Sequence, residues 1–200
     1  MKSVQEIVDL ASAYYGSAVL FAAIDCDIFA KVAQGTLDLS SRGMRLLADA
    51  CVAEGLLIKK DGIYANTPAG EMSLIPGGRA DITQAIRYNR DVYPAWGRLA
   101  ELARSSRPVE RPELHLGEDP GRTKVFAAAM FGRAMGIGQG IVPMLGRLDG
   151  RLLDLAGGPA AYAILMCQAN PSLRCTTVDL PAIAAEARGY VARFGLADRI

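Results

Sequence analysis

The sequence predicts an α/β protein in which an α-helical, winged-helix domain precedes the first β-α-β-α part of a Rossmann-like domain. Two observations predict this fold class. A hairpin signal, Asp61-Gly62 between two short apolar runs, follows helical segments as a wing follows the helices of a winged helix. From Arg151 onward, buried-strand patterns alternate with helical patterns, as in a doubly wound sheet. We expect a first domain at 1–105, a linker at 106–122 and an incomplete second domain at 123–200.

The first part of the chain has mainly helical periodicity. Residues 3–33 carry an apolar face and are predicted to form a helix in one or two pieces, which Gly35 ends. A second helix is expected to start at Ser40 or Ser41, either of which can cap it, and to end at Gly55. Its inner face is predicted to comprise Met44, Leu46, Leu47, Ala50 and Cys51.

Two strands and two further helices are predicted next. The runs 56–60 and 63–65 flank the Asp61-Gly62 turn, and Thr67-Pro68 opens a short helix. Residues 82–104 are again helical in pattern. The Pro-rich stretch that follows is interpreted as the linker, and a long helix at 123–148 is expected to be interrupted or bent near Pro143.

The second domain is predicted to contain two parallel strands. These are 151–155 and 173–178, and helices follow them at Pro159–Ala169 and 182–194. The printed sequence ends where a third strand is expected to begin. Two parallel strands are too few to form a stable sheet, so we expect this domain to be truncated.

The composition excludes several classes of function. Lys and Arg together number 22 and Asp and Glu 21, so no basic surface for nucleic acid or an anionic membrane is expected. The four cysteines form no C-x-x-C pair and His115 is the only histidine, so no zinc site is expected. We interpret the cysteines as buried thiols in a reducing cytoplasm. No secretory signal is predicted, because residues 1–9 are polar and lack a basic segment followed by an apolar run. No membrane span is predicted, because Asp25 and Asp27 interrupt the most apolar stretch.

The most informative motif joins the first strand of the second domain to its helix. The strand delivers Asp154, the glycines Gly157 and Gly158 allow a ligand to approach the backbone, and the helix N-terminus favours an anionic group. Asp179 ends the next strand, where a carboxylate accepts hydrogen bonds from ribose hydroxyls. S-adenosylmethionine fits this pattern, since Asp154 suits its ammonium group. NAD, whose G-x-G-x-x-G motif is absent, and an ordinary strand-to-helix turn remain the alternatives.

The same stretch resembles a known family. L-D-L-A-G-G-P-A-A-Y-A-I…V-D-L-P resembles the first two motifs of the plant-type and bacterial O-methyltransferases related to caffeate and acetylserotonin methyltransferases. The runs G-L-L-I-K-K-D-G-I-Y-A-N-T-P, Y-P-A-W-G-R-L-A-E-L and F-A-A-A-M are similar to the family's wing, its next signature and the helix that enters its catalytic domain.

The resemblance implies a fold, a cofactor, an activity and an assembly. It implies a winged-helix dimerisation domain, a Rossmann-like methyltransferase domain, and methyl transfer from S-adenosylmethionine to a small-molecule hydroxyl. It places Asp154 at the methionine end of the cofactor, with Gly157, Gly158 and Asp179 lining the site. It also implies a homodimer through the N-terminal helices, whose apolar face from Val4 to Ile24 is large for a lone surface helix.

The sequence departs from the family pattern at the site. Ala156 and Ala160 stand where the family usually has glycine, and each is expected to add a methyl close to the cofactor. The family's catalytic histidine and its acidic partners belong beyond Ile200, so no catalytic residue is assigned and the chain is expected to be inactive alone. The alternatives are a non-catalytic dimerisation or binding fragment and a winged-helix regulator.

Several other residues have competing interpretations. His115 is interpreted as a surface or interdomain residue rather than a base, and Trp96 as a packing anchor. The glycines of 136–140 are interpreted as sites of close helix packing. Core packing is favoured over an acceptor pocket for Phe126 and Met130. Dimerisation is favoured over DNA binding, because acidic neighbours balance the basic residues of the predicted helix and wing, which are Arg42, Arg45, Lys59 and Lys60.

Overall fold

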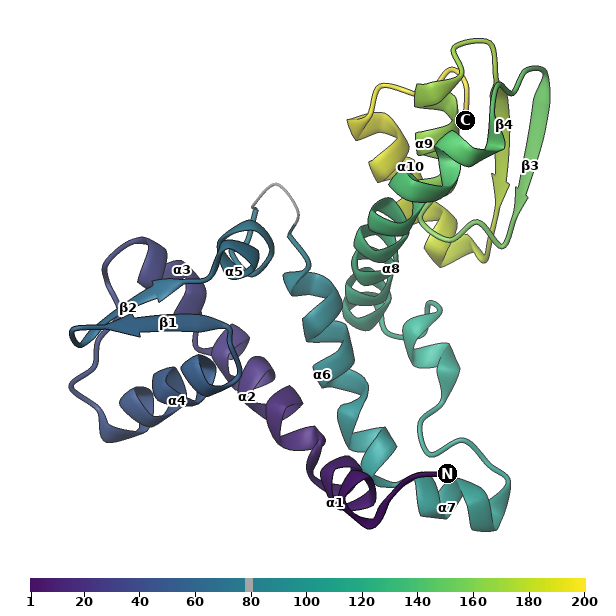
Figure 1. The fold of residues 1–200 in the computed structure, drawn as a ribbon. Helices are drawn as coiled ribbons and strands as arrows, with labels where there is room; N and C mark the ends of the chain where they lie inside the picture. The colour runs from purple at the N-terminus through teal and green to yellow at the C-terminus, as the bar shows by residue number, and fades with distance from the viewer. Residues whose placement is uncertain (78–80) are drawn as a thin grey trace. The chain divides into compact units, whose positions relative to one another are not determined.

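The computed structural model describes residues 1–77 and 81–200, and the chain divides into two compact units. We call Met1–Ile86 the N-terminal unit and Arg87–Ile200 the C-terminal unit, and each is described by itself (Figure 1). The division falls inside the helical stretch expected at 82–104, ahead of the expected boundary at residue 105. The assignment of 1–105 as a dimerisation domain, 106–122 as a linker and 123–200 as part of a methyltransferase domain stays a prediction.

The N-terminal unit consists of helices and one hairpin. The helix expected over 3–33 has three pieces. The second of the two breaks falls at Asp27, which adopts a left-handed backbone conformation with φ 54° that an α-helix cannot contain. A capping box between Ser3 and Glu6 starts the first piece. The elements are α1 (Val4–Ser12), α2 (Tyr14–Asp25), α3 (Ile28–Ala33), α4 (Arg42–Ala53), β1 (Leu57–Lys60), β2 (Ile63–Asn66) and α5 (Pro68–Ser73).

The hairpin is confirmed as predicted. β1 and β2 are antiparallel, and the pairing of Lys60 with Ile63 leaves Asp61 and Gly62 as a two-residue loop. Both loop residues have positive φ, 49° and 80°, as a type I′ turn requires. Thr67 then caps α5, because its Oγ1 accepts a hydrogen bond from the Gly70 amide at 3.1 Å.

The core of the N-terminal unit lies where α2, α3 and α4 meet the hairpin (Figure 1). Phe29 and Cys51 are fully buried in it. The inner face predicted for α4 differs from the structure at two residues, because Leu46 is 56% exposed and Ala48, which was not predicted, is fully buried. Ser41 stands at the N-cap position, but its side chain makes no capping hydrogen bond.

The C-terminal unit combines long helices with a two-stranded parallel sheet. β3 and β4 pair in register from Arg151 with Arg174 to Leu155 with Val178. The elements are α6 (Thr83–Gly97), α7 (Leu99–Ser105), η1 (Pro112–His115), α8 (Pro120–Ile141), η2 (Val142–Leu145), β3 (Arg151–Leu155), α9 (Ala161–Ala169), β4 (Arg174–Val178) and α10 (Pro181–Arg193). The first turn of α6 precedes the boundary between the two units at Ile86.

Several boundaries in this unit differ from those predicted, and the helix expected over 82–104 is divided into α6 and α7 at Arg98. α8 begins at Pro120, because Asp119 accepts a hydrogen bond from the Arg122 amide and caps the helix. The interruption expected near Pro143 is confirmed, because α8 ends at Ile141 and a 3-10 turn that contains Pro143 follows it. α9 begins at Ala161 rather than Pro159, since Gly158 and Ala160 have positive φ and cannot belong to a right-handed helix.

One face of the small sheet is covered and the other is open. Ile164 of α9 and Val191 of α10 join Cys175 of β4 in a buried apolar cluster. On the opposite face, Leu153 and Leu155 are 63% and 74% exposed. At the edge of β4, beside which a third strand is expected to begin, the Arg199 carbonyl accepts a hydrogen bond from the Cys175 amide at 2.8 Å.

Two helical segments pass a membrane-span test of length and composition, contrary to the expectation from sequence. They are Val4–Asp25, with mean hydropathy 1.6, and Pro120–Leu145, with mean hydropathy 1.4. Core helices of soluble proteins and signal sequences pass the same test, so this observation alone does not assign a span. Within the described residues, no cluster of three or more Cys, His, Asp or Glu is arranged to bind a metal ion.

Candidate functional site

The turn between β3 and α9 brings the predicted site residues together. Asp154 is the fourth residue of β3, and Gly157 and Gly158 form the turn that follows. The Gly157 amide donates a hydrogen bond to the carbonyl of Val178 at 3.3 Å, which ties the turn to the end of β4. Asp179 follows directly, so both carboxylates lie at the carboxyl ends of adjacent parallel strands, where doubly wound sheets bind ligands.

The carboxylate of Asp154 lies against the glycine turn. Its Oδ2 accepts a hydrogen bond from Thr177 Oγ1 at 3.2 Å. A Cβ on Gly157 would lie 2.5 Å from the same oxygen, so only glycine leaves room for the carboxylate there. Burial raises the pKa of Asp154, the Thr177 hydrogen bond opposes this rise, and the charge of Asp179 adds to it.

The carboxylate of Asp179 already has two backbone partners. Its Oδ2 accepts a hydrogen bond from the Gly158 amide and its Oδ1 one from the Leu180 amide, both at 2.7 Å. A carboxylate has about four acceptor sites, so room for further donors remains. Asp179 therefore both fixes the turn and offers acceptors to a ligand, and the sequence indicated only the second property.

The two alanines of the turn differ from each other. Ala156 and Ala160 have φ of 56° and 64°, a left-handed conformation that glycine adopts without strain. Ala156 lines the cavity described below, as expected. Ala160 is fully buried in the apolar cluster beneath the sheet, so the expectation that its methyl group adds bulk near the cofactor is wrong.

A cavity of about 460 Å³ opens beside this turn, within the C-terminal unit. Asp154 and Asp179 line it from the sheet, and Phe126 and Met130 line it from α8. Both α8 side chains are half-buried, and Phe126 also packs against the ring of Tyr88 at 5.5 Å between centroids, so packing and a place in the cavity wall are compatible for it.

Arg133 is a lining residue that the sequence analysis missed. It is exposed, and among the described residues it is the only Lys or Arg that lines the cavity. With Phe126 and Met130 it forms an i, i+4, i+7 series on one face of α8, a spacing that was readable from the sequence. The cavity thus combines two carboxylates, one guanidinium and apolar walls.

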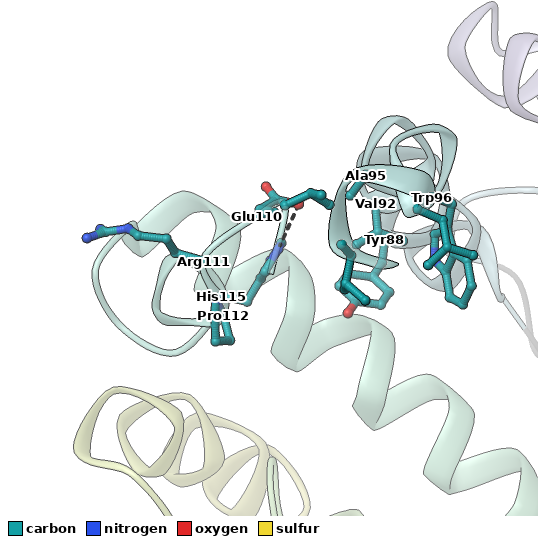
Figure 2. Close-up of a pocket in the computed structure, with 11 residues that line it drawn as sticks. Tyr88, Val92, Ala95, Trp96, Glu110, Arg111, Pro112 and His115 are labelled. Carbon is teal, nitrogen blue, oxygen red and sulfur yellow. Dashed lines mark ion pairs between the residues drawn. The ribbon is translucent and has the colours of Figure 1, made fainter. Parts of the chain in front are cut away.

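His115 and Trp96 lie at a second, smaller groove of about 270 Å³ in the same unit (Figure 2). The side chain of His115 is only 12% exposed and lies 3.8 Å from the Glu110 carboxylate, measured from Nε2 to Oε2, so a surface role is wrong. Its ring packs edge-on against Tyr88 at 5.7 Å between centroids. Trp96 is 67% exposed, so within the described chain it is not a packing anchor.

Two other interpretations have mixed outcomes. A Cβ on Gly138 would collide with Leu165 Cδ1 of α9, so this glycine does permit close helix packing. Gly136 and Gly140 face open space instead. In the predicted wing, Lys59 donates a hydrogen bond to Asp49 at 2.6 Å, which reduces its availability to an external phosphate.

Comparison with known proteins identifies the relatives of this chain. No family model matches it. The chain is 30% identical over 212 residues to 3-hydroxy-5-methyl-1-naphthoate 3-O-methyltransferase of Streptomyces sahachiroi, a match that covers 97% of the chain and 60% of the relative. The chain is homologous to the O-methyltransferases.

Solved structures agree with this assignment. This chain matches an O-methyltransferase family protein from Burkholderia thailandensis with a TM-score of 0.81 and 25% identity, over 100% of the chain and 63% of that protein. It shares the fold of human N-acetylserotonin methyltransferase in complex with SAM, with a TM-score of 0.75 and 24% identity, over 95% of the chain and 64% of that protein. This chain therefore spans somewhat under two thirds of the length of these relatives.

Proposed function

We propose that this chain binds S-adenosylmethionine at the turn after β3. We propose also that it forms the cofactor-binding part of an O-methyltransferase that acts on a small-molecule hydroxyl. The observation that carries this proposal is the meeting of Asp154, Gly157, Gly158 and Asp179 at one turn beside one cavity. The homology to O-methyltransferases, and the complex of one structural neighbour with SAM, support it.

The residues present fit the cofactor. Asp154 is placed to pair with the ammonium group of the methionine moiety, and the acceptor sites left on Asp179 suit ribose hydroxyls. Arg133 supplies the cation that the cofactor's carboxylate requires. Gly157 leaves the space in which Asp154 sits, and the Cβ position of Gly158 is open. When bound, S-adenosylmethionine supplies an electrophilic methyl group on its sulfonium sulfur.

NAD is the competing ligand, and calorimetry separates the two. Tighter binding of S-adenosylmethionine or S-adenosylhomocysteine than of NAD is expected, because Asp154 and Arg133 match a zwitterionic amino acid and not a nicotinamide. Tighter binding of NAD to the same chain would overturn the proposal.

We also propose that the 200-residue chain does not transfer methyl groups by itself. A base that takes the acceptor's proton contributes about 10²–10⁴-fold in rate. No histidine is among the described residues that line the cavity, and both of its carboxylates have structural partners. Assay of the purified chain with labelled cofactor and phenolic and indolic hydroxyl acceptors tests this. Turnover above background, without a partner protein, would contradict it.

The N-terminal unit is proposed to be a winged-helix dimerisation domain and to form a homodimer. Val4, Ile7, Val8 and Leu10 of α1 are all exposed, so the N-terminal unit leaves an apolar surface on this helix uncovered. Light scattering at micromolar concentration is expected to give the mass of a dimer. The variant Val8→Glu is expected to give a monomer, and a monomeric wild type would contradict the proposal.

The compartment is proposed to be the reducing cytoplasm. All four cysteines are free, and Cys51, Cys167 and Cys175 are buried. Burial raises the pKa of Cys51 and of Cys175 to about 11, so these thiols are protonated and poorly reactive at neutral pH.

A further inference from the structure

Thr177 lies directly across the sheet from Asp154. The two residues are register partners on β4 and β3, so their side chains point to the same face of the sheet. The Thr177 side chain is half-buried, and its Oγ1 donates to Asp154 Oδ2 at 3.2 Å. Thr177 lies in the strand predicted at 173–178, and the sequence indicated no role for it at the site.

Two contacts define where the Asp154 carboxylate sits. On one side the Thr177 hydroxyl binds Oδ2, and on the other the carboxylate carbon and oxygens lie against the Cα of Gly157, within 2.5–3.0 Å of where a Cβ would be. Gly157 only provides space, whereas Thr177 provides a directional attraction. In the described part of the chain, no other side chain is recorded as a hydrogen-bond partner of this carboxylate.

We infer that Thr177 is a positioning residue, which holds the Asp154 carboxylate toward the glycine turn and keeps it available as an anion for the ammonium group of the cofactor. This inference rests on the proposed function, because it assumes that Asp154 faces the methionine end of the ligand. Thr177 touches no reacting atom and acts through Asp154 alone.

The charges around Asp154 make this role measurable. Burial and the charge of Asp179 both raise the pKa of Asp154, and the Thr177 hydroxyl is the group that lowers it. Cys175, also on β4, is protonated at neutral pH, and Arg133 of α8 lines the same cavity. Loss of the hydroxyl therefore raises the pKa further. Since only the anion pairs with ammonium, binding is then lost at a higher pH as the solution is acidified.

The test compares Thr177→Val, which keeps the shape of the side chain, with Thr177→Ser, which keeps the hydroxyl. Calorimetry from about pH 5 to about pH 8 with S-adenosylhomocysteine is expected to show roughly 10-fold weaker binding to the valine variant, the loss of one hydrogen bond to a charged group. Serine is expected to restore the affinity and the pH profile. 5′-Methylthioadenosine, which lacks the ammonium and carboxylate groups, is expected to bind wild type and both variants equally.

A second readout needs no ligand. Carbon-13 NMR of the Asp154 carboxyl in the full chain is expected to show a higher pKa in Thr177→Val than in wild type or Thr177→Ser. If wild type binds neither nucleoside ligand, the proposed function fails, and the NMR titration still decides whether Thr177 acts on Asp154. Unchanged titration of Asp154 in the valine variant, or equal loss of both nucleoside ligands, would overturn the inference.

Discussion

Two tight turns of the molecule both contain residues in the left-handed conformation, but they place different residue types there. In the β1–β2 hairpin, the left-handed positions are Asp61 and Gly62, residue types that adopt positive φ readily. In the turn after β3, two of the left-handed positions are Ala156 and Ala160, where this conformation costs roughly 1–2 kcal/mol per residue. The hairpin turn thus follows from its own residues, whereas the second turn is imposed by its surroundings.

The surroundings of the second turn are identifiable. The Gly158 amide donates a hydrogen bond to the Asp179 carboxylate, and the Gly157 amide donates one to the Val178 carbonyl. The methyl group of Ala160 is fully buried. Strain of this kind persists only where neighbouring contacts hold it, and it is concentrated at functional sites. The difference between the turns therefore supports placing the ligand site at the second one.

Gly157→Ala is expected to have the largest effect. The new Cβ would lie 2.5 Å from Asp154 Oδ2, so the carboxylate must leave its place beside Thr177. We expect affinity for S-adenosylhomocysteine to fall at least about 10-fold and stability by about 1–3 kcal/mol, as for overpacking elsewhere. Gly136→Ala in α8 is the control, since its Cβ would face open space. Unchanged binding by Gly157→Ala would show that Asp154 has no defined place at the turn.

Asp179→Ala removes the acceptor that fixes Gly158. Two backbone amides lose a partner at 2.7 Å, and we expect the free energy of unfolding to fall by about 1–3 kcal/mol together with loss of cofactor binding. Asp179→Asn retains one carbonyl acceptor and is expected to lose less stability. Denaturant titration measures both. A variant as stable as wild type would mean that the turn keeps its conformation without Asp179.

Asp154→Asn separates stability from binding. The pKa of Asp154 is raised above 3.8 in the folded chain, chiefly by burial, so folding disfavours its anion and the protonated form is the more stable one. The neutral amide should therefore stabilise the chain near neutral pH. The gain should shrink as pH falls through the raised pKa and disappear below 3.8. Thermal melts at several pH values test this, and cofactor affinity should fall in the same variant.

The smallest effects come from direct substitution at the left-handed positions. Ala156→Gly, at an exposed residue, is expected to stabilise the chain by about 0.5–1 kcal/mol, since relief of strain exceeds the entropy cost of glycine. Ala160→Gly should gain less, because it also loses a buried methyl group worth about 0.8 kcal/mol. Gly62→Ala in the hairpin should have the opposite sign. Destabilisation by Ala156→Gly would contradict the strain at this turn.

Sequence patterns predicted the elements whose conformation is locally determined. The hairpin has its own turn chemistry, and β3 has its own apolar run. The order of strand, turn and strand also predicted that the four proposed site residues lie at one turn, whereas their role in binding stays a prediction. The start of α9 was mispredicted because Pro159 is a good first helical residue, and only tertiary contacts explain the left-handed Ala160 that follows it. The burial of His115 and the exposure of Trp96 also depend on packing between distant segments, which local periodicity does not report.

The most direct test of the central claim is an amide NMR titration of the 200-residue chain with S-adenosylhomocysteine. If the strained turn after β3 is the cofactor site, the amide signals of Gly157 and Gly158 shift in a saturable way, and that of Gly62 in the unstrained hairpin turn stays unchanged. NAD at the same concentration produces smaller shifts. Saturable binding that leaves the signals of Gly157 and Gly158 unmoved would contradict the account.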